Sequence, residues 1–153
     1  LISNCSNNYG PYQHNEKFIP IIINNIINNK KIPVYGDGSQ IREWLFVDDH
    51  CKALTKLIEF GNPGENYNIG SGNEISNLEL IKLILKILKD FSVIDTVDEM
   101  KYIKFTNDRL GHDKRYSINC SKVKKLCNWN ISTSFENGLI KTVSSIINVN
   151  NNF

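Results

Sequence analysis

The chain has 153 residues, of which 41% are hydrophobic and 10% aromatic, and its formal net charge is +2 at pH 7. This length is typical of one globular domain, and so small a net charge excludes the strongly basic patterning of proteins that bind nucleic acids or membrane surfaces. No apolar stretch reaches the roughly 18 residues of a membrane span, and no basic region precedes an apolar core as in a signal peptide.

The first half of the sequence predicts alternating strands and helices. Residues 1–5 resemble the end of a strand that leads into an Asn-Asn-Tyr-Gly-Pro turn, and isoleucines recur at helical spacing from Ile19 to Ile27. Pro20 is tolerated there because it lies in the first turn of the helix. Short strands are predicted at 32–35 and 44–47, followed by a helix that Asp48 caps and that stops at Gly61.

The second half continues the same pattern. A strand is predicted at 67–69, and Ser76 and Glu79 have the spacing of a capping box at the start of an amphipathic helix. Further elements are expected as follows: a strand at 102–105, a polar loop at 108–115, a helix that Ser121 caps and that ends near Cys127 with Asn128 left-handed, and a last helix behind a second capping box at 133–136. Together these elements predict one mixed α/β unit.

The four cysteines indicate a reducing compartment, and their spacing argues against a bound metal ion. Cys5, Cys51, Cys120 and Cys127 form no C-x-x-C pair, and no histidine lies at metal-ligand spacing from them. We therefore expect no metal site. Free thiols in a chain of this size are typical of a reducing compartment, so a cytoplasmic location is expected.

Two segments have side chains suited to a nucleotide sugar. Residues 6–12 place amides and tyrosines around a Gly-Pro turn, a set of uncharged groups that suits sugar hydroxyls and carboxamides. Residues 33–44 place Arg42, whose planar guanidinium suits a phosphate, beside a glycine-rich turn and Trp44. Each segment taken alone also fits an ordinary surface turn.

Other groups could hold a diphosphate. Arg42 and Arg109 are candidate clamps, and the capped helix start at Asn77 is expected to offer unpaired backbone N–H groups to an anion. The mixed charges of residues 108–115 also fit a salt-bridged surface loop, in which His112 would have no catalytic role. Likewise, Lys17 also fits a helix-start residue with no function.

Two motifs of nicotinamide enzymes are missing from the sequence. No G-x-G-x-x-G turn occurs, because Ile41 stands where Gly36-Asp37-Gly38 would need a third glycine. No tyrosine is followed by a lysine four residues later. We therefore assign no catalytic residue within this chain.

Six blocks in sequence order resemble the C-terminal portion of the dTDP-glucose 4,6-dehydratase family, within the extended short-chain dehydrogenase/reductase superfamily. The resemblance extends from Leu1 to about Val149, and its blocks are 6–12, 16–20, 33–36, 40–45, 67–70 and 108–113. It implies the α/β C-terminal portion of an NAD(P)-binding Rossmann-type nucleotide-sugar enzyme. Residues 1–149 would form the substrate-binding portion and 150–153 a frayed tail, with the N-terminal Rossmann half absent from this chain.

The resemblance also implies site residues, a cofactor and a reaction. Asn7 would lie against the nicotinamide end of NAD and Asn8 against the dTDP-sugar. The hexose would be oxidised at C4 by NAD, lose water across C5 and C6, and be reduced at C6, with the catalytic Tyr, Lys and acidic pair upstream of Leu1. The complete enzyme would be a homodimer. The remaining residues implied to line the substrate pocket are Lys17, Phe18, Pro33, Val34, Tyr35, Arg42, Asn77, Asp108, Arg109, Leu110, Gly111 and His112.

The chain departs from the family pattern at four positions. Leu110 replaces the usual proline, Glu43 the usual aspartate, Phe18 a common aliphatic residue and Asn4 an often basic one. Two alternatives stay open: a non-catalytic module that binds nucleotide sugars, and a related UDP-sugar epimerase or decarboxylase. The Arg-Glu-Trp and Asp-Arg-Leu-Gly-His blocks argue against the latter.

Overall fold

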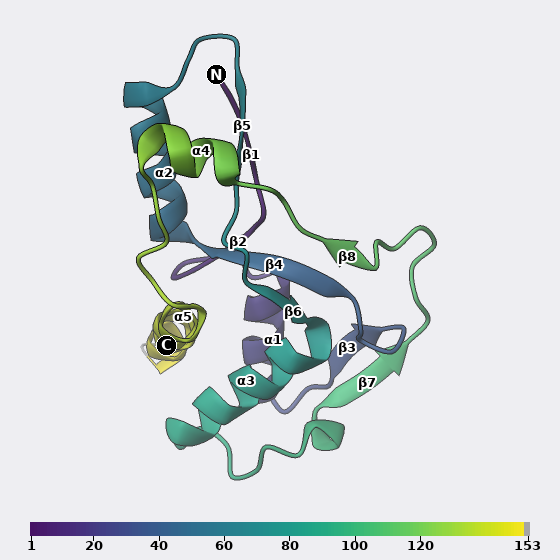
Figure 1. Ribbon diagram of the computed structural model, residues 1–153. Coiled ribbons are helices and arrows are strands. Elements are labelled where there is room, and N and C mark those ends of the chain that lie inside the picture. The colour runs from purple at the N-terminus through teal and green to yellow at the C-terminus, as the bar shows by residue number, and fades with distance from the viewer. Residues whose placement is uncertain (152–153) are drawn as a thin grey trace.

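The computed structural model describes residues 1–151 and has the mixed α/β architecture that the sequence predicts (Figure 1). None of its helices combines the length and hydropathy that crossing a membrane requires. The elements are β1 (Ile2–Cys5), β2 (Asn7–Tyr9), α1 (Phe18–Ile27), β3 (Ile32–Tyr35), β4 (Ile41–Phe46), α2 (Val47–Phe60), β5 (Asn66–Ile69), β6 (Glu74–Ser76), α3 (Asn77–Asp90), η1 (Glu99–Lys101, a 3-10 helix), β7 (Ile103–Thr106), β8 (Arg115–Tyr116), α4 (Ser121–Cys127) and α5 (Phe135–Asn151).

Strand β4 is the centre of the strand arrangement. It pairs in parallel with β2 and β8 and antiparallel with β6. Two further parallel pairs, β1 with β5 and β3 with β7, lie on opposite sides of this group (Figure 1). Parallel strands need long crossovers, and the helices between these strands supply them.

The side chains of β4 alternate between two hydrophobic cores, as the two-residue period of a strand requires. Trp44 and Phe46 enter the larger core, which the buried faces of α1, α3 and α5 complete. Leu45 enters a second core with residues of α2, β5 and α4, among them Trp129. One short strand therefore joins the two halves of the molecule.

The local signals for α1 and α3 are confirmed. In α1 the isoleucines at positions 19, 22, 23 and 26 are buried and Ile27 is partly buried, and Pro20 lies in the first turn. At the start of α3, Ser76 Oγ accepts from Glu79 N at 3.2 Å, and the Glu79 carboxylate accepts from Ser76 N at 3.0 Å. Asn128 has the left-handed conformation predicted for it, with φ 46°.

Three strands were not predicted from sequence. Residues 7–9, expected to be part of a turn, form β2, and its Tyr9 is buried with its hydroxyl donating to Phe135 O at 3.1 Å. Strands β6 and β8 are short and polar, and β8 lies at the end of the segment expected to be a loop. These strands depend on pairing with β4, which lies far from them in the sequence.

Three predicted helix caps are wrong. Asp48 lies inside the first turn of α2, whose N-cap is Phe46, and the N-cap of α4 is Cys120 rather than Ser121. At α5, Ser134 Oγ accepts from Asn137 N, while Thr133 N donates to the Asp49 carboxylate. Each shift is one or two residues, which is the usual uncertainty of a helix boundary.

The predicted frayed tail comprises residues 150–153. Residues 150 and 151 continue the helix, and residues 152–153 lie outside the described residues.

We predict that the 153-residue chain self-associates through β1. Among the described strands β1 pairs only with β5, and Leu1 and Ile2 are more than half exposed. The Ile2 amide donates to the carbonyl of Glu65 and the Ser6 amide to that of Ile69, at 3.1 Å each. Because successive amides of a strand point to opposite edges, the Ser3 amide points to the open edge. An open strand edge is a template for pairing with another chain.

Ser3→Pro should reduce this association, measured by sedimentation velocity, because it removes an edge donor without breaking the β1–β5 ladder. Asn4→Pro is the control that breaks the ladder and should lower the melting temperature instead. A monodisperse parent monomer with a cooperative melt would contradict the prediction.

Candidate functional site

One cleft brings together most of the residues that the sequence analysis selected. It has a volume of about 200 Å³ and lies between β3, β4, the first residues of α1 and α3, and the β7–β8 loop. Nine predicted residues line it, together with Trp44: Asn7, Phe18, Pro33, Val34, Tyr35, Arg42, Asn77, Arg109 and His112.

Strands β2 and β4 form one wall of the cleft. Arg42 and Trp44 are two residues apart on β4, so their side chains lie on the same face of the strand. Asn7 is opposite Trp44 in the parallel β2–β4 register. This pairing places an amide, an indole and a guanidinium on one surface, although Asn7 is far from the other two in sequence.

Tyr35 on β3 organises a second part of the cleft lining. The Arg109 guanidinium lies over the Tyr35 ring, 4.4 Å from its centroid, and the His112 ring meets Tyr35 edge-on at 6.3 Å between centroids. A guanidinium stacked on an aromatic face keeps its edge N–H groups available to other acceptors. The stack therefore orders Arg109 without neutralising it.

Asp108 anchors the loop that carries Arg109 and His112. Its carboxylate contacts His112 Nδ1 at 2.6 Å and accepts from Arg109 N at 2.9 Å and from Gln40 Nε2 at 3.0 Å. The hydrogen bond from His112 is the main reason why the pKa of Asp108 lies below its ordinary value. Gly36 allows this approach, because its φ is +58° and a Cβ there would lie 3.0 Å from the carboxylate.

The two arginines of the cleft have no carboxylate partner within residues 1–151. Arg42 donates to the carbonyl of Ile41 at 2.8 Å, and Arg109 stacks on Tyr35. By contrast Arg115, outside the cleft, is bound by Glu74 through two contacts of 2.6 and 2.7 Å. The cleft thus presents two unneutralised guanidinium groups, the side chains that best match phosphate oxygens.

The start of α3 does not offer the free amides that the sequence suggested. The amides of Asn77 and Leu78 donate to the carbonyls of Gln40 and Gly38 at 3.1 and 3.2 Å, and that of Glu79 donates to Ser76 Oγ. The β3–β4 turn occupies the position expected for an anion. Only the Asn77 side chain and the helix dipole remain for a ligand.

Five predicted residues lie outside the cleft lining. Asn8 Nδ2 donates to Ser6 O at 3.1 Å, and Lys17 is exposed at the N-cap of α1. Asp108 supports the cleft from behind, as described. Leu110, the most exposed large apolar residue, and Gly111 lie at the outer tip of the loop.

Trp44 and Gln40 were not among the predicted site residues. Trp44 was noted beside Arg42, but the strand predicted there, 44–47, begins after Arg42, whereas β4 contains both residues. Gln40 is 5% exposed and joins the β3–β4 turn to Asp108. No local pattern indicates this contact, because its partner is 68 residues away in sequence.

The chain belongs to the GDP-mannose 4,6 dehydratase family, whose model matches residues 1–142. It is 45% identical over 152 residues to a dTDP-glucose 4,6-dehydratase of Escherichia coli, covering 97% of this chain and 42% of that enzyme. It is 47% identical over 146 residues to the dTDP-glucose 4,6-dehydratase of Neisseria gonorrhoeae, covering 94% and 42%. The chain therefore spans about two fifths of the length of these relatives.

Solved structures have the same fold. DesIV, a dTDP-glucose 4,6-dehydratase from Streptomyces venezuelae solved with NAD and TYD bound, superposes with a TM-score of 0.89 at 37% identity over 99% of this chain and 45% of DesIV. The dTDP-glucose 4,6-dehydratase of Bacillus anthracis in complex with NAD gives 0.84 at 42% identity, over 95% and 44%. The UDP-glucuronic acid 4-epimerase of Bacillus cereus gives 0.82 at 23% identity and shares the fold alone.

We predict that His112→Ala raises the pKa of Asp108 toward its ordinary value, because it removes the strongest hydrogen bond to the carboxylate. The pKa of Asp108 is measured from the NMR chemical shift of its carboxyl carbon during an acid titration. Since the folded pKa is lowered, the stabilisation from these contacts is present above the ordinary value of 3.8 and is lost as the pH falls through the lowered one.

Gln40→Ala is the matched control for the same titration and should move the midpoint less, because its hydrogen bond to Asp108 is the weakest of the causes. Equal midpoints in the parent and the His112 variant would contradict the assignment.

Proposed function

We propose that this chain is the substrate-binding portion of an NAD-dependent dTDP-glucose 4,6-dehydratase, which converts dTDP-glucose to dTDP-4-keto-6-deoxyglucose. The observation that carries the proposal is the cleft with two carboxylate-free guanidinium groups, in a chain 45% identical to such an enzyme. Diphosphate is the part of the substrate that requires this charge.

The other groups of the cleft suit the rest of the ligand. Arg42 on β4 and Arg109 on the β7–β8 loop both line the cleft, so both can contact a diphosphate bound there. Phe18, Pro33 and Val34 give an apolar surface for the base, and the Asn77 amide can bond a sugar or phosphate oxygen. Trp44, which is only 4% exposed, also lines the cleft.

The described residues fit NAD only at one end. The Asn7 amide, half-buried on the cleft wall, can pair with a carboxamide such as that of nicotinamide. No glycine turn for a pyrophosphate occurs in the sequence. Oxidation at C4 and reduction at C6 are the chemistry that a bound NAD supplies, and the residues of this chain contribute binding and orientation.

We also propose a cytoplasmic location and a homodimer for the complete enzyme. All four cysteines are free thiols, and two of them are buried, which supports a reducing compartment.

Arg42→Ala should weaken dTDP binding more than Asn8→Ala, with Arg109→Ala close behind. A unit charge about 4 Å from a phosphate is worth roughly 4 kcal/mol gross at an effective dielectric near 20, whereas a neutral hydrogen bond nets about 0.5–1.5 kcal/mol. A loss of about 1.5–3 kcal/mol for a charged hydrogen bond corresponds to roughly a tenfold or larger rise in Kd. In addition, Asn8 already bonds to Ser6 within the protein.

The measurement is calorimetric affinity for dTDP in the full-length polypeptide, meaning the complete enzyme proposed above, of which these 153 residues are the substrate-binding portion. Lys125→Ala, an exposed cation on α4, controls for net charge and should leave Kd unchanged. If Arg42→Ala binds dTDP as tightly as the parent, the pocket assignment fails.

We predict that the 153-residue chain alone, with NAD added, does not turn over dTDP-glucose, because it contains neither Tyr-x-x-x-Lys nor a dinucleotide-binding turn. Formation of the 4-keto product above a protein-free blank would refute this. Binding of dTDP without turnover in the full-length polypeptide would favour the alternative of a non-catalytic module.

A further inference from the structure

Glu43 is a wholly buried carboxylate in the centre of β4. It stands between Arg42 and Trp44, and the alternation of the strand directs its side chain away from the cleft that they line. A charge removed from water is strongly destabilising unless hydrogen bonds or a counter-ion compensate for it. The partners of Glu43 therefore show what this residue does.

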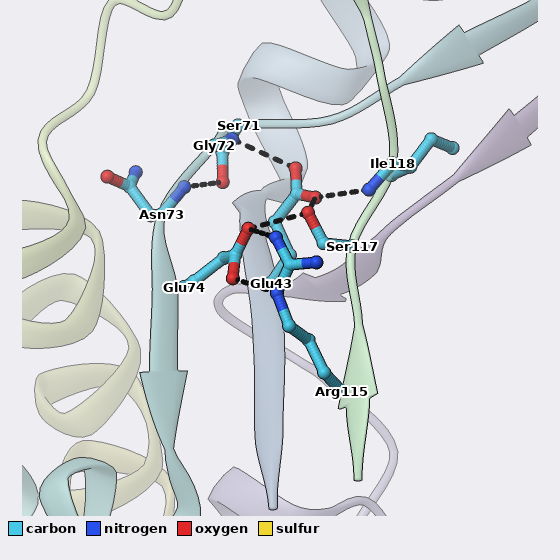
Figure 2. Close-up of polar contacts among 8 residues, drawn as sticks. All are labelled: Glu43, Ser71, Gly72, Asn73, Glu74, Arg115, Ser117 and Ile118. Atoms are coloured by element: carbon cyan, nitrogen blue, oxygen red, sulfur yellow. Dashed lines mark hydrogen bonds and ion pairs between the residues drawn. The ribbon is translucent and has the colours of Figure 1, made fainter. Parts of the chain in front are cut away.

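Two backbone amides from different segments donate to Glu43 (Figure 2). Gly72 N donates to one carboxylate oxygen at 2.9 Å, and Ile118 N donates to the other at 2.8 Å. Gly70 permits the approach, because a Cβ there would lie 2.3 Å from the carboxylate. Because one amide comes from each segment and both donate to the same carboxylate, Glu43 links the β5–β6 turn to the segment after β8.

A second carboxylate completes the cluster. Ser117 Oγ lies 3.1 Å from Glu43 and 2.7 Å from Glu74, and its single proton can serve one of them at a time. Glu74 is also held by the two contacts from Arg115 on β8 (Figure 2). Strands β6 and β8, both hydrogen-bonded to β4, are thus joined to each other across it.

Each of the three joined segments carries residues of the cleft or lies next to an element that does. Strand β4 carries Arg42 and Trp44, the turn that Gly72 belongs to leads through β6 to Asn77, and β8 follows directly on the loop with Arg109 and His112. We infer that Glu43 is a positioning residue, which sets the spacing of the two guanidinium groups by fixing these three segments around one buried carboxylate. This inference rests on the proposed function, since the ligand that this spacing serves is the diphosphate of a nucleotide sugar.

Asp49 provides a matched control from the same chain. It is also wholly buried and accepts from Thr133 N at 2.9 Å and from the Ser132 hydroxyl. These contacts join α2 to the segment before α5, and none of the three residues lines the cleft. Loss of either carboxylate should lower stability, but only loss of Glu43 should change the cleft.

The experiment compares Glu43→Gln, Glu43→Asp and Asp49→Asn in the full-length polypeptide, by calorimetric affinity for dTDP at a temperature where all are folded. In Glu43→Gln an amide NH₂ group replaces one carboxylate oxygen and must face a backbone N–H, so one hydrogen bond is lost. We expect the Kd for dTDP to rise about tenfold. Loss of a residue that positions the ligands of a metal site weakens binding by about 10- to 100-fold, and we take the lower end of that range. Glu43→Asp keeps the carboxylate and should bind more tightly than Glu43→Gln. Asp49→Asn should melt at a lower temperature and keep the parent affinity.

Hydrogen exchange in the absence of ligand separates this inference from the proposed function. Glu43→Gln should lose protection in peptides covering 70–77 and 107–118, whereas Asp49→Asn should not. If the parent fails to bind dTDP, the proposed function is wrong, and the exchange data alone decide whether Glu43 orders the three segments. Parent-like exchange in Glu43→Gln, or equal losses of affinity in Glu43→Gln and Asp49→Asn, would overturn the inference.

Discussion

The structure depends on the use of both faces of β4. Its six residues, Ile41–Phe46, include apolar side chains that enter two separate cores, an arginine in the cleft and a buried carboxylate behind it. Because the side-chain period of a strand is two, a slip of one residue would move Arg42 into the interior and Glu43 into the cleft. The register of β4 with β2, β6 and β8 therefore determines the charge of the cleft as well as the packing of the molecule.

The cleft is positively charged because its two arginines, Arg42 and Arg109, have no carboxylate partner within residues 1–151. In the described part of the chain, Arg115 is the only one of the three arginines that a carboxylate neutralises, and it lies outside the cleft. Arg109 is ordered instead by the face of Tyr35, and Arg42 by a backbone carbonyl. Exposed ion pairs contribute little to stability, so leaving these two arginines unpaired costs the fold little and keeps them available for an anion.

Three buried polar side chains connect loops and helices by hydrogen bonds that lie outside the strand ladders. Gln40 ties the β3–β4 turn to Asp108, Glu43 ties the β5–β6 turn to the segment after β8, and Asp49 ties α2 to the residues before α5. In each case the partners include backbone amides or a neighbouring side chain far away in sequence. Buried polar contacts are strongest when all the donors and acceptors are satisfied. Both carboxylate oxygens of Glu43 and of Asp49 have partners, whereas the buried Gln40 Oε1 has none.

The sequence by itself determined the elements whose signals are local. The isoleucine period identified α1, the Ser76–Glu79 capping box identified α3, and the order of short blocks identified the family and nine residues of the cleft. Tertiary structure alone decided the rest. Strand β2 exists because Tyr9 is buried against β4 and α5, the amides at the start of α3 are taken by the β3–β4 turn, and Glu43 obtains its donors from residues 29 and 75 positions away. The physical reason is the same in each case: a hydrogen bond between distant segments forms only after packing has brought its donor and acceptor together, and nothing in either local sequence encodes that approach.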